Sequence, residues 1–123
     1  MANLSGTWLG TYWQQGNPTR FEATLIQGGN NLSGNILDDN YLGEARLSGE
    51  VIGRKISFTK SYITSSQYII NYVGTVSEDE NFIQGQWRIN KFNSGIWEAH
   101  RNNDDLISEL KNHLSQKSPV LLS

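Results

Sequence analysis

The sequence predicts an all-β protein, an eight-stranded antiparallel up-and-down β-barrel followed by a short C-terminal α-helix. Apolar and polar residues alternate with a period of two, and short breaks rich in Gly, Asn, Asp and Ser separate the alternating stretches. Only two prolines occur, both near the ends of the chain, and central strands avoid proline. The alternating stretches are residues 5–13, 19–27, 31–38, 42–51, 54–61, 66–77, 81–90 and 94–101.

The breaks between these stretches are short, so neighbouring strands are expected to pair antiparallel and to close into a barrel without exposed edges. A five-residue pattern recurs in the strands: an apolar residue, any residue, Gly, any residue, an apolar residue. Its first, third and fifth positions share one face of a strand. Inward glycines would let the strands of a small barrel bend and would leave room for large neighbours. The copies are LSGTW, LSGNI, LSGEV, YVGTV and IQGQW, which begin at Leu4, Leu32, Leu47, Tyr72 and Ile83.

The C-terminal segment has a different period. Leu106, Leu110 and Leu114 are spaced by four residues, which predicts one helix over about residues 104–116 with an apolar stripe. We therefore expect residues 1–102 to form the barrel and residues 103–123 to form a helix and tail. The stripe needs a partner, which is a barrel end, the outer wall of the barrel or another subunit.

Composition excludes several classes of function. The chain has 10 basic and 12 acidic side chains, so it lacks the basic surface of a nucleic-acid-binding protein. It has no cysteine, which excludes disulfides and thiolate metal sites. No apolar run reaches the ~20 residues of a membrane-spanning helix, and no signal peptide is visible, so we expect a cytoplasmic protein without a membrane partner. No motif such as GxSxG indicates catalytic residues, and none is assigned.

The GTW sequence that ends at Trp8 opens the first strand of this meander and resembles the calycin superfamily, which includes lipocalins, fatty-acid-binding proteins and avidins. The later segments ISFTKSY, YIINYVGTV, IQGQW and SGIW are most similar to the avidin branch. The resemblance implies that Trp8 closes one end of the barrel and that Arg101, in the last strand, lies across its ring. Such a cation–π contact contributes about 0.5–2 kcal/mol.

The same resemblance places Trp87 in the lining of a ligand cup and Phe58 near the aromatic residue of the fifth strand. Gly10, however, stands where avidins have an asparagine that bonds biotin, so the resemblance does not extend to biotin binding. The GTWLG sequence also resembles nitrobindin-like barrels, which bind haem through a histidine near the C-terminus. Here His100 has outward parity, because its neighbour Arg101 is the inward residue. We therefore expect no metal site and no cofactor.

If Trp8 and Arg101 close one end, the opposite end is the possible mouth of a cup. Aromatic side chains with polar tips, together with one lysine, suit a small planar or partly anionic ligand. Lys60 would bind an anion, pair with an acid such as Asp38 or Glu44, or extend outward to solvent. The candidate ligand-binding residues are Tyr12, Phe21, Tyr41, Phe58, Lys60, Tyr62, Tyr68, Tyr72 and Trp87, with Tyr41 and Tyr62 placed in loops.

Three functions remain open at this stage. The first is binding of an aromatic, acyl or anionic small molecule in the barrel mouth. The second is an isomerase or cyclase that works by shaping its substrate. The third is a structural module, because side chains can fill an eight-stranded barrel completely. Outward apolar residues predict a homo-oligomer that forms through the barrel walls or the C-terminal helix; they are Leu9, Trp13, Ile26, Leu37, Ile69, Val73 and Ile96.

Overall fold

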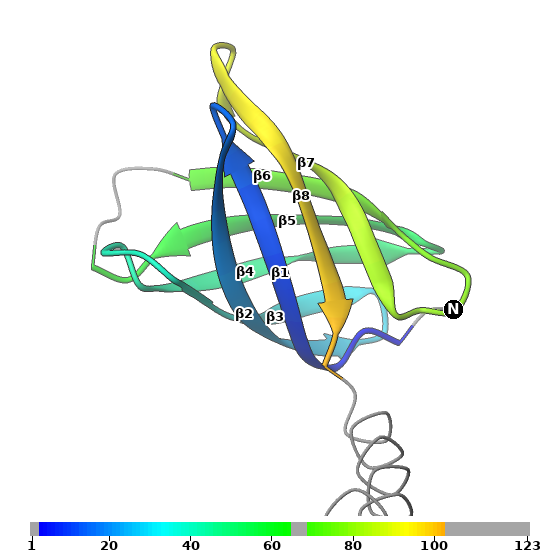
Figure 1. The fold of residues 1–123 in the computed structure, drawn as a ribbon. Helices are drawn as coiled ribbons and strands as arrows, with labels where there is room; N and C mark the ends of the chain where they lie inside the picture. Colours follow the sequence, from blue (N-terminus) through cyan, green and yellow to red (C-terminus); the bar gives the residue numbers. More distant parts are fainter. Residues whose placement is uncertain (1–2, 65–68, 103–123) are drawn as a thin grey trace, which may run out of the picture.

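A computed structural model describes residues 3–64 and 69–102 as one closed barrel (Figure 1). Each strand pairs antiparallel with its neighbours in sequence, and the first strand pairs with the last. The predicted eight-stranded antiparallel barrel is therefore confirmed, with strand ends within a few residues of those expected. The strands are β1 (Gly6–Gln14), β2 (Asn17–Gly28), β3 (Asn31–Asp38), β4 (Glu44–Ile52), β5 (Lys55–Tyr62), β6 (Ile69–Val76), β7 (Phe82–Asn90) and β8 (Asn93–Arg101).

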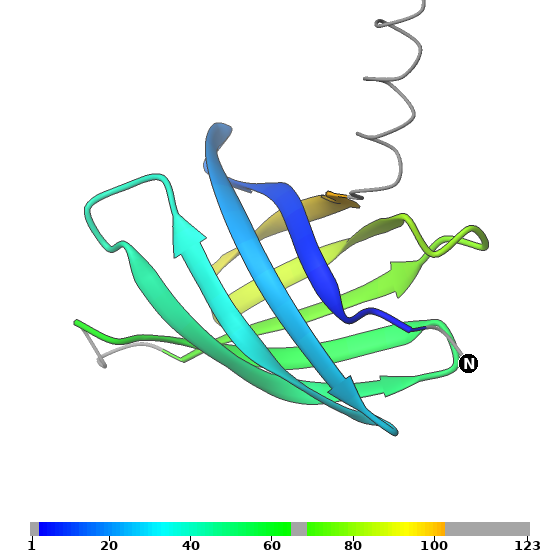
Figure 2. The same cartoon turned by 90° about the horizontal axis from the view of Figure 1, so that it is seen from below.

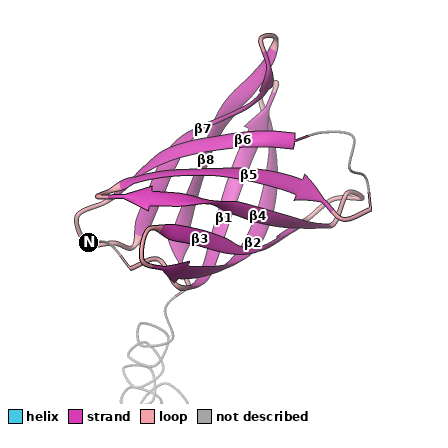
Figure 3. Cartoon of the chain, turned by 180° about the vertical axis from the view of Figure 1, so that it is seen from behind, coloured by secondary structure: helices cyan, strands magenta, loops and turns pink. Residues whose placement is uncertain are grey.

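The strands curve around one common interior (Figure 2). The described part of the chain consists of strands and connecting loops only (Figure 3), and it contains no helix long and apolar enough to cross a membrane. The helix predicted over residues 104–116 lies outside the described residues. Sharp turns join the strands: Gln15 and Gly16 both have positive φ angles, 52° and 82°, as a two-residue turn of type I′ requires. Such turns match the right-handed twist of the strands that they connect.

The recurring glycines lie where neighbouring strands approach most closely. A Cβ atom at Gly34 would overlap the carbonyl group of Thr24, and one at Gly85 would overlap the carbonyl group of Val73. The apolar residues on either side of these glycines are buried; the flanking pairs are Leu32 with Ile36 and Ile83 with Trp87. The inward parity predicted from the repeated pattern is therefore present in the barrel.

One end of the barrel is closed by the N-terminal segment. Trp8 is buried, and its indole nitrogen donates a hydrogen bond of 2.9 Å to the carbonyl oxygen of Leu4. The guanidinium carbon of Arg101 lies 4.6 Å from the centre of a Trp8 ring. Arg101 also donates to the carbonyl oxygens of Asn3 and Glu80, each at 2.8 Å. Arg101 thus connects the chain before β1 to the loop between β6 and β7.

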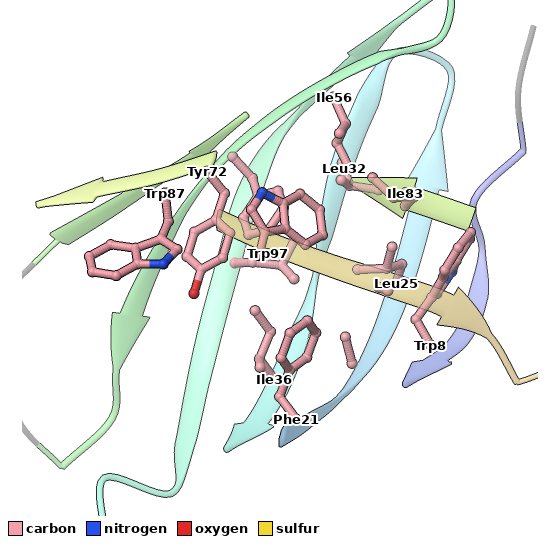
Figure 4. Close-up of a cluster of buried hydrophobic side chains, with 14 of the residues drawn as sticks. Trp8, Phe21, Leu25, Leu32, Ile36, Ile56, Tyr72, Ile83, Trp87 and Trp97 are labelled. Carbon is pink, nitrogen blue, oxygen red and sulfur yellow. The ribbon is translucent and has the colours of Figure 1, made fainter. Parts of the chain in front are cut away.

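Aromatic side chains fill the middle of the barrel. Phe58 and Tyr72 stack with ring centres 4.8 Å apart, and Trp97 meets both rings edge-on. Figure 4 shows Trp97 within the buried cluster, with Trp8 and Trp87 toward its opposite ends. Buried apolar side chains lie between the closed end and this aromatic layer, among them Leu25, Leu32 and Ile83.

The outer wall carries several exposed apolar side chains. They include Ile26, which is 62% exposed, and Leu9, Leu37, Ile69, Val73 and Ile96, all of which were expected to point outward. Trp13 is half-buried, and its carbonyl oxygen accepts a hydrogen bond from the indole of Trp87. Self-association through this wall stays a prediction.

Candidate functional site

The barrel end opposite Trp8 and Arg101 holds a cavity of about 620 Å³. This volume lies within the roughly 300–1,000 Å³ that is usual for sites that bind small molecules. None of the described side chains that line the cavity carries a charge, and the aromatic ones among them come from β1, β5, β6, β7 and the β3–β4 loop. The lining residues are Tyr12, Gln14, Tyr41, Leu42, Tyr62, Thr64, Ile70, Tyr72, Trp87, Ile89, Asn90 and Asn93. We call this cavity the cup.

A buried ion pair lies beside the cup. The Nζ atom of Lys60, on β5, lies 2.7 and 2.8 Å from the two carboxylate oxygens of Asp38, the last residue of β3. Both side chains are fully buried. Of the three roles open to Lys60 from sequence, the structure shows pairing with an acid. Each charge compensates the other, which is necessary because removing either charge from water costs several kcal/mol.

Tyrosines surround this ion pair. The hydroxyl groups of Tyr62 and Tyr12 both donate to Oδ2 of Asp38, and the side-chain amide of Asn40 donates to the Tyr12 hydroxyl at 3.0 Å. The Lys60 nitrogen lies 4.8 Å from the ring centres of both Tyr12 and Tyr62. Donors therefore saturate the carboxylate, and aromatic rings surround the ammonium group.

Burial sets the ionisation of these groups. It raises the pKa of Tyr62, with a further rise from the hydrogen bond to Asp38, and it raises the pKa of Tyr12 and Tyr72, with a further rise from the Asp38 charge. Burial lowers the pKa of Lys60, and the neighbouring Asp38 carboxylate opposes this change. The three tyrosines therefore keep their protons and act as hydrogen-bond donors near neutral pH.

The hydroxyl group of Tyr72 is different from the other two. Tyr72 is only 3% exposed, and its register partner on β7 is Trp87 (Figure 4). Its hydroxyl has no hydrogen-bond partner among the described residues. Every fully enclosed side-chain nitrogen or oxygen atom of those residues does have a partner. The Tyr72 hydroxyl is therefore not enclosed. Because Tyr72 lines the cup, this hydroxyl faces the cup space.

The structure separates the sequence-predicted residues into two layers. Tyr12, Tyr41, Tyr62, Tyr72 and Trp87 line the cup, and Tyr62 belongs to β5 rather than to a loop. Phe21, Phe58 and Lys60 are buried but do not line the cup: Phe21 packs on Tyr12, Phe58 stacks on Tyr72, and Lys60 pairs with Asp38. Tyr68 lies outside the described residues.

Sequence reasoning also left lining residues unassigned. Ile70 shares the inward parity of Tyr72, so alternation alone could have placed its side chain in the barrel interior. Ile89 lies at a register irregularity between β7 and β8, which strict alternation does not predict. His100 is exposed on the outside of β8, and no group of His, Asp or Glu side chains among the described residues could hold a metal ion.

Comparison with known proteins gives likeness in fold only. The sequence matches no protein-family model and no curated protein. Among solved structures, it is similar to a de novo designed fluorescence-activating β-barrel, with a TM-score of 0.60, 14% identity, and coverage of 80% of this chain and 93% of that one. A redesigned β-barrel, mFAP1, bound to DFHBI, has a TM-score of 0.63 at 10% identity, with coverage of 80% and 94%.

A further redesigned β-barrel reaches a TM-score of 0.65 at 10% identity, with coverage of 82% of this chain and 92% of that one. These similarities agree with the closed eight-stranded barrel. They do not show membership of the calycin superfamily or of its avidin branch, and both remain resemblances of short sequence motifs.

Proposed function

We propose that this protein binds a small molecule in the cup. The observation that carries the proposal is a cavity of about 620 Å³ at one end of the barrel, with the hydroxyl of the buried residue Tyr72 facing into it. Side chains can fill an eight-stranded barrel completely, whereas here they leave this space open. Apolar walls with a few polar groups that fix orientation are typical of ligand sites.

The similar structures support the proposal in one respect. A redesigned barrel of this fold is described as bound to DFHBI, so a small closed barrel with this strand arrangement can hold a compact organic molecule. Binding is favoured over catalysis by the groups available in the cup. Tyrosines are the only titratable side chains among the described lining residues, and Asp38 and Lys60 are engaged with each other.

Three fluorescent probes test the proposal by equilibrium titration: pyrene, which is an uncharged hydrocarbon; Nile red, which is uncharged and has a ring carbonyl; and 1-anilinonaphthalene-8-sulfonate, which is an anion. We expect at least one probe to bind with one-to-one stoichiometry. Native mass spectrometry of freshly purified protein would show in addition any compound that the cup already carries.

Two matched variants locate the binding. Ile89→Trp places a large side chain at the cup rim, whereas Ile26→Trp makes the same change on the outer wall, where Ile26 is 62% exposed. Probe binding should be lost in Ile89→Trp and retained in Ile26→Trp, with both variants folded by circular dichroism. Binding that survives in Ile89→Trp, or the absence of binding by all three probes, would refute the proposed function.

A further inference from the structure

We infer that the cup takes an uncharged, flat ring compound with a hydrogen-bond acceptor that receives the proton of the Tyr72 hydroxyl. This inference rests on the proposed function and narrows the chemical class of the ligand. It is carried by three features of the cup: the absence of charge in its described lining, the internal neutralisation of the neighbouring ion pair, and the Tyr72 hydroxyl, which faces the cavity without a partner among the described residues.

The first two features disfavour a charged ligand. The buried charged side chains among the described residues are Asp38 and Lys60, and they neutralise each other at 2.7 Å. An anion in the cup would add a second negative charge near Asp38, with no cationic side chain among the described lining residues to pair with it. An uncompensated buried charge is strongly unfavourable. A cation would meet the same lack of a counter-ion, because Tyr12, Tyr62 and Lys60 already saturate the Asp38 carboxylate.

The third feature defines the polar group of the ligand. Tyr72 keeps its proton, since burial and the Asp38 charge both raise its pKa. A ligand that covered this donor without offering an acceptor would leave it unsatisfied, which is costly, and unpaired donors are rarer in proteins than acceptors with a spare lone pair. An oxygen or nitrogen acceptor on the ligand satisfies this donor. Side-chain amides of Gln14, Asn90 and Asn93 also line the cup and can pair with further uncharged polar groups of the ligand.

The aromatic walls define the shape of the ligand. Five of the described lining residues have aromatic rings: Tyr12, Tyr41, Tyr62, Tyr72 and Trp87. Rings prefer offset-stacked or edge-to-face contacts with other rings, which a planar ligand satisfies more fully than a flexible chain does. Phe58 already covers one face of the Tyr72 ring, and this stacking fixes the direction in which the hydroxyl points.

The same three probes test the inference. Nile red should bind about five- to tenfold more tightly in the wild-type protein than in Tyr72→Phe, which loses the hydroxyl and keeps the ring. Pyrene has no acceptor, so Tyr72→Phe should leave its affinity within about twofold. The control variant Thr24→Val removes a hydroxyl from the outer wall and should change neither affinity. The anionic probe should bind the wild-type cup more weakly than Nile red does.

The outcomes separate this inference from the proposed function. Equal or tighter binding of the anionic probe at the Ile89→Trp-sensitive site would overturn the uncharged class while leaving small-molecule binding intact. An equal effect of Tyr72→Phe on Nile red and pyrene would overturn the role of the hydroxyl. If Tyr72→Phe does not fold, the comparison of the three probes on wild-type protein still decides between an anionic and an uncharged ligand. A failure of every probe to bind refutes the proposed function instead.

Discussion

Among the described residues, Asp38 and Lys60 are the two charged residues that are buried. Both are fully buried, and the carboxylate also accepts hydrogen bonds from the hydroxyl groups of Tyr12 and Tyr62. A buried ion pair contributes little net stability compared with apolar residues of the same volume, but the loss of one partner leaves an uncompensated charge. The arrangement therefore makes each of the two residues dependent on the other.

Removal of one charge at a time tests this dependence. We expect Asp38→Asn to lower the free energy of unfolding by about 3–5 kcal/mol, because the ammonium group of Lys60 stays buried without a counter-ion. The double variant Asp38→Asn/Lys60→Met should lose less than the sum of the two single changes. Urea unfolding of the wild-type protein, Asp38→Asn, Lys60→Met and the double variant completes the double-mutant cycle.

The exposed pair Arg54–Glu78 provides the control for that cycle. The Nη1 atom of Arg54 lies 3.7 Å from the Oε1 atom of Glu78, and the two side chains are 52% and 91% exposed, respectively. Its removal by Arg54→Met should change the free energy of unfolding by less than about 1 kcal/mol. If the effects of Asp38→Asn and Lys60→Met on the free energy of unfolding are additive and as small as that of Arg54→Met, the two buried charges are not coupled.

At the scale of the strand, the inward glycines determine how closely β6 and β7 approach. Gly74 and Gly85 are register partners, and a Cβ atom at Gly85 would overlap the Val73 backbone. The register partner of Gly85 on the other side is Trp97, one of the large side chains of the filled interior. Large rings opposite glycines allow a small barrel to be strongly curved and still filled.

Gly85→Ala should therefore destabilise the barrel, by about 1–3 kcal/mol, because the backbone must move to admit the methyl group. Gly28→Ala is the matched control: Gly28 lies at the end of β2, and a Cβ atom there would meet nothing within 4 Å. We expect the control to change the free energy of unfolding by less than about 0.5 kcal/mol. Equal effects of the two substitutions in thermal or urea unfolding would contradict the close-approach interpretation of Gly85.

Alternation predicts the parts of the fold that depend on side-chain parity alone. It places Trp8, Tyr72 and Trp87 inside and His100 outside, and the structure agrees. It does not predict which inward residues at the cup end touch one another. The contact between Lys60 and Asp38 depends on the stagger of β3 against β5 across β4, and a sequence does not state that stagger.

The boundary between the cup and the filled interior could not be derived from the sequence for a related reason. Phe58 and Tyr72 have the same inward parity and are register partners, yet only Tyr72 reaches the cup. The difference arises from strand tilt and from the stacking of the two rings. Ile89 reaches the cup lining next to an irregularity in the β7–β8 register, which breaks the period of two.

At the scale of the whole molecule, the two barrel ends differ in how they are closed. One end is covered by the N-terminal segment, which Trp8 and Arg101 bind through hydrogen bonds to the main chain. The other end has the cup, with the tyrosine-lined ion pair beside it. Folding and the protonation of the buried tyrosines are linked, because burial at this end raises the pKa of Tyr12, Tyr62 and Tyr72 in the folded barrel.

This linkage predicts alkaline unfolding. The pKa values of Tyr12, Tyr62 and Tyr72 are raised above their ordinary value of 10.0 in the folded state, so above about pH 10 the unfolded chain releases protons that the folded barrel retains. The free energy of unfolding should then fall with rising pH, by up to about 1.4 kcal/mol per pH unit for each tyrosine. Burial lowers the pKa of Lys60 from 10.5, so this group makes the free energy of unfolding rise with pH. Lys60 is a single group, and the opposite effect comes from three tyrosines.

We therefore expect stability to be nearly constant or to rise slightly with pH until about pH 10 and to fall steeply above it. Tyrosinate absorbance should report the link directly: of the five tyrosines in the chain, at least three should ionise only together with the loss of the β-sheet circular dichroism signal. Complete ionisation of all five while the β-sheet signal persists would show that the hydroxyl groups at the cup end are not held protonated by the fold. In that case the hydroxyl groups of Tyr12 and Tyr62 would be more accessible to solvent than their hydrogen bonds to the buried Asp38 carboxylate imply.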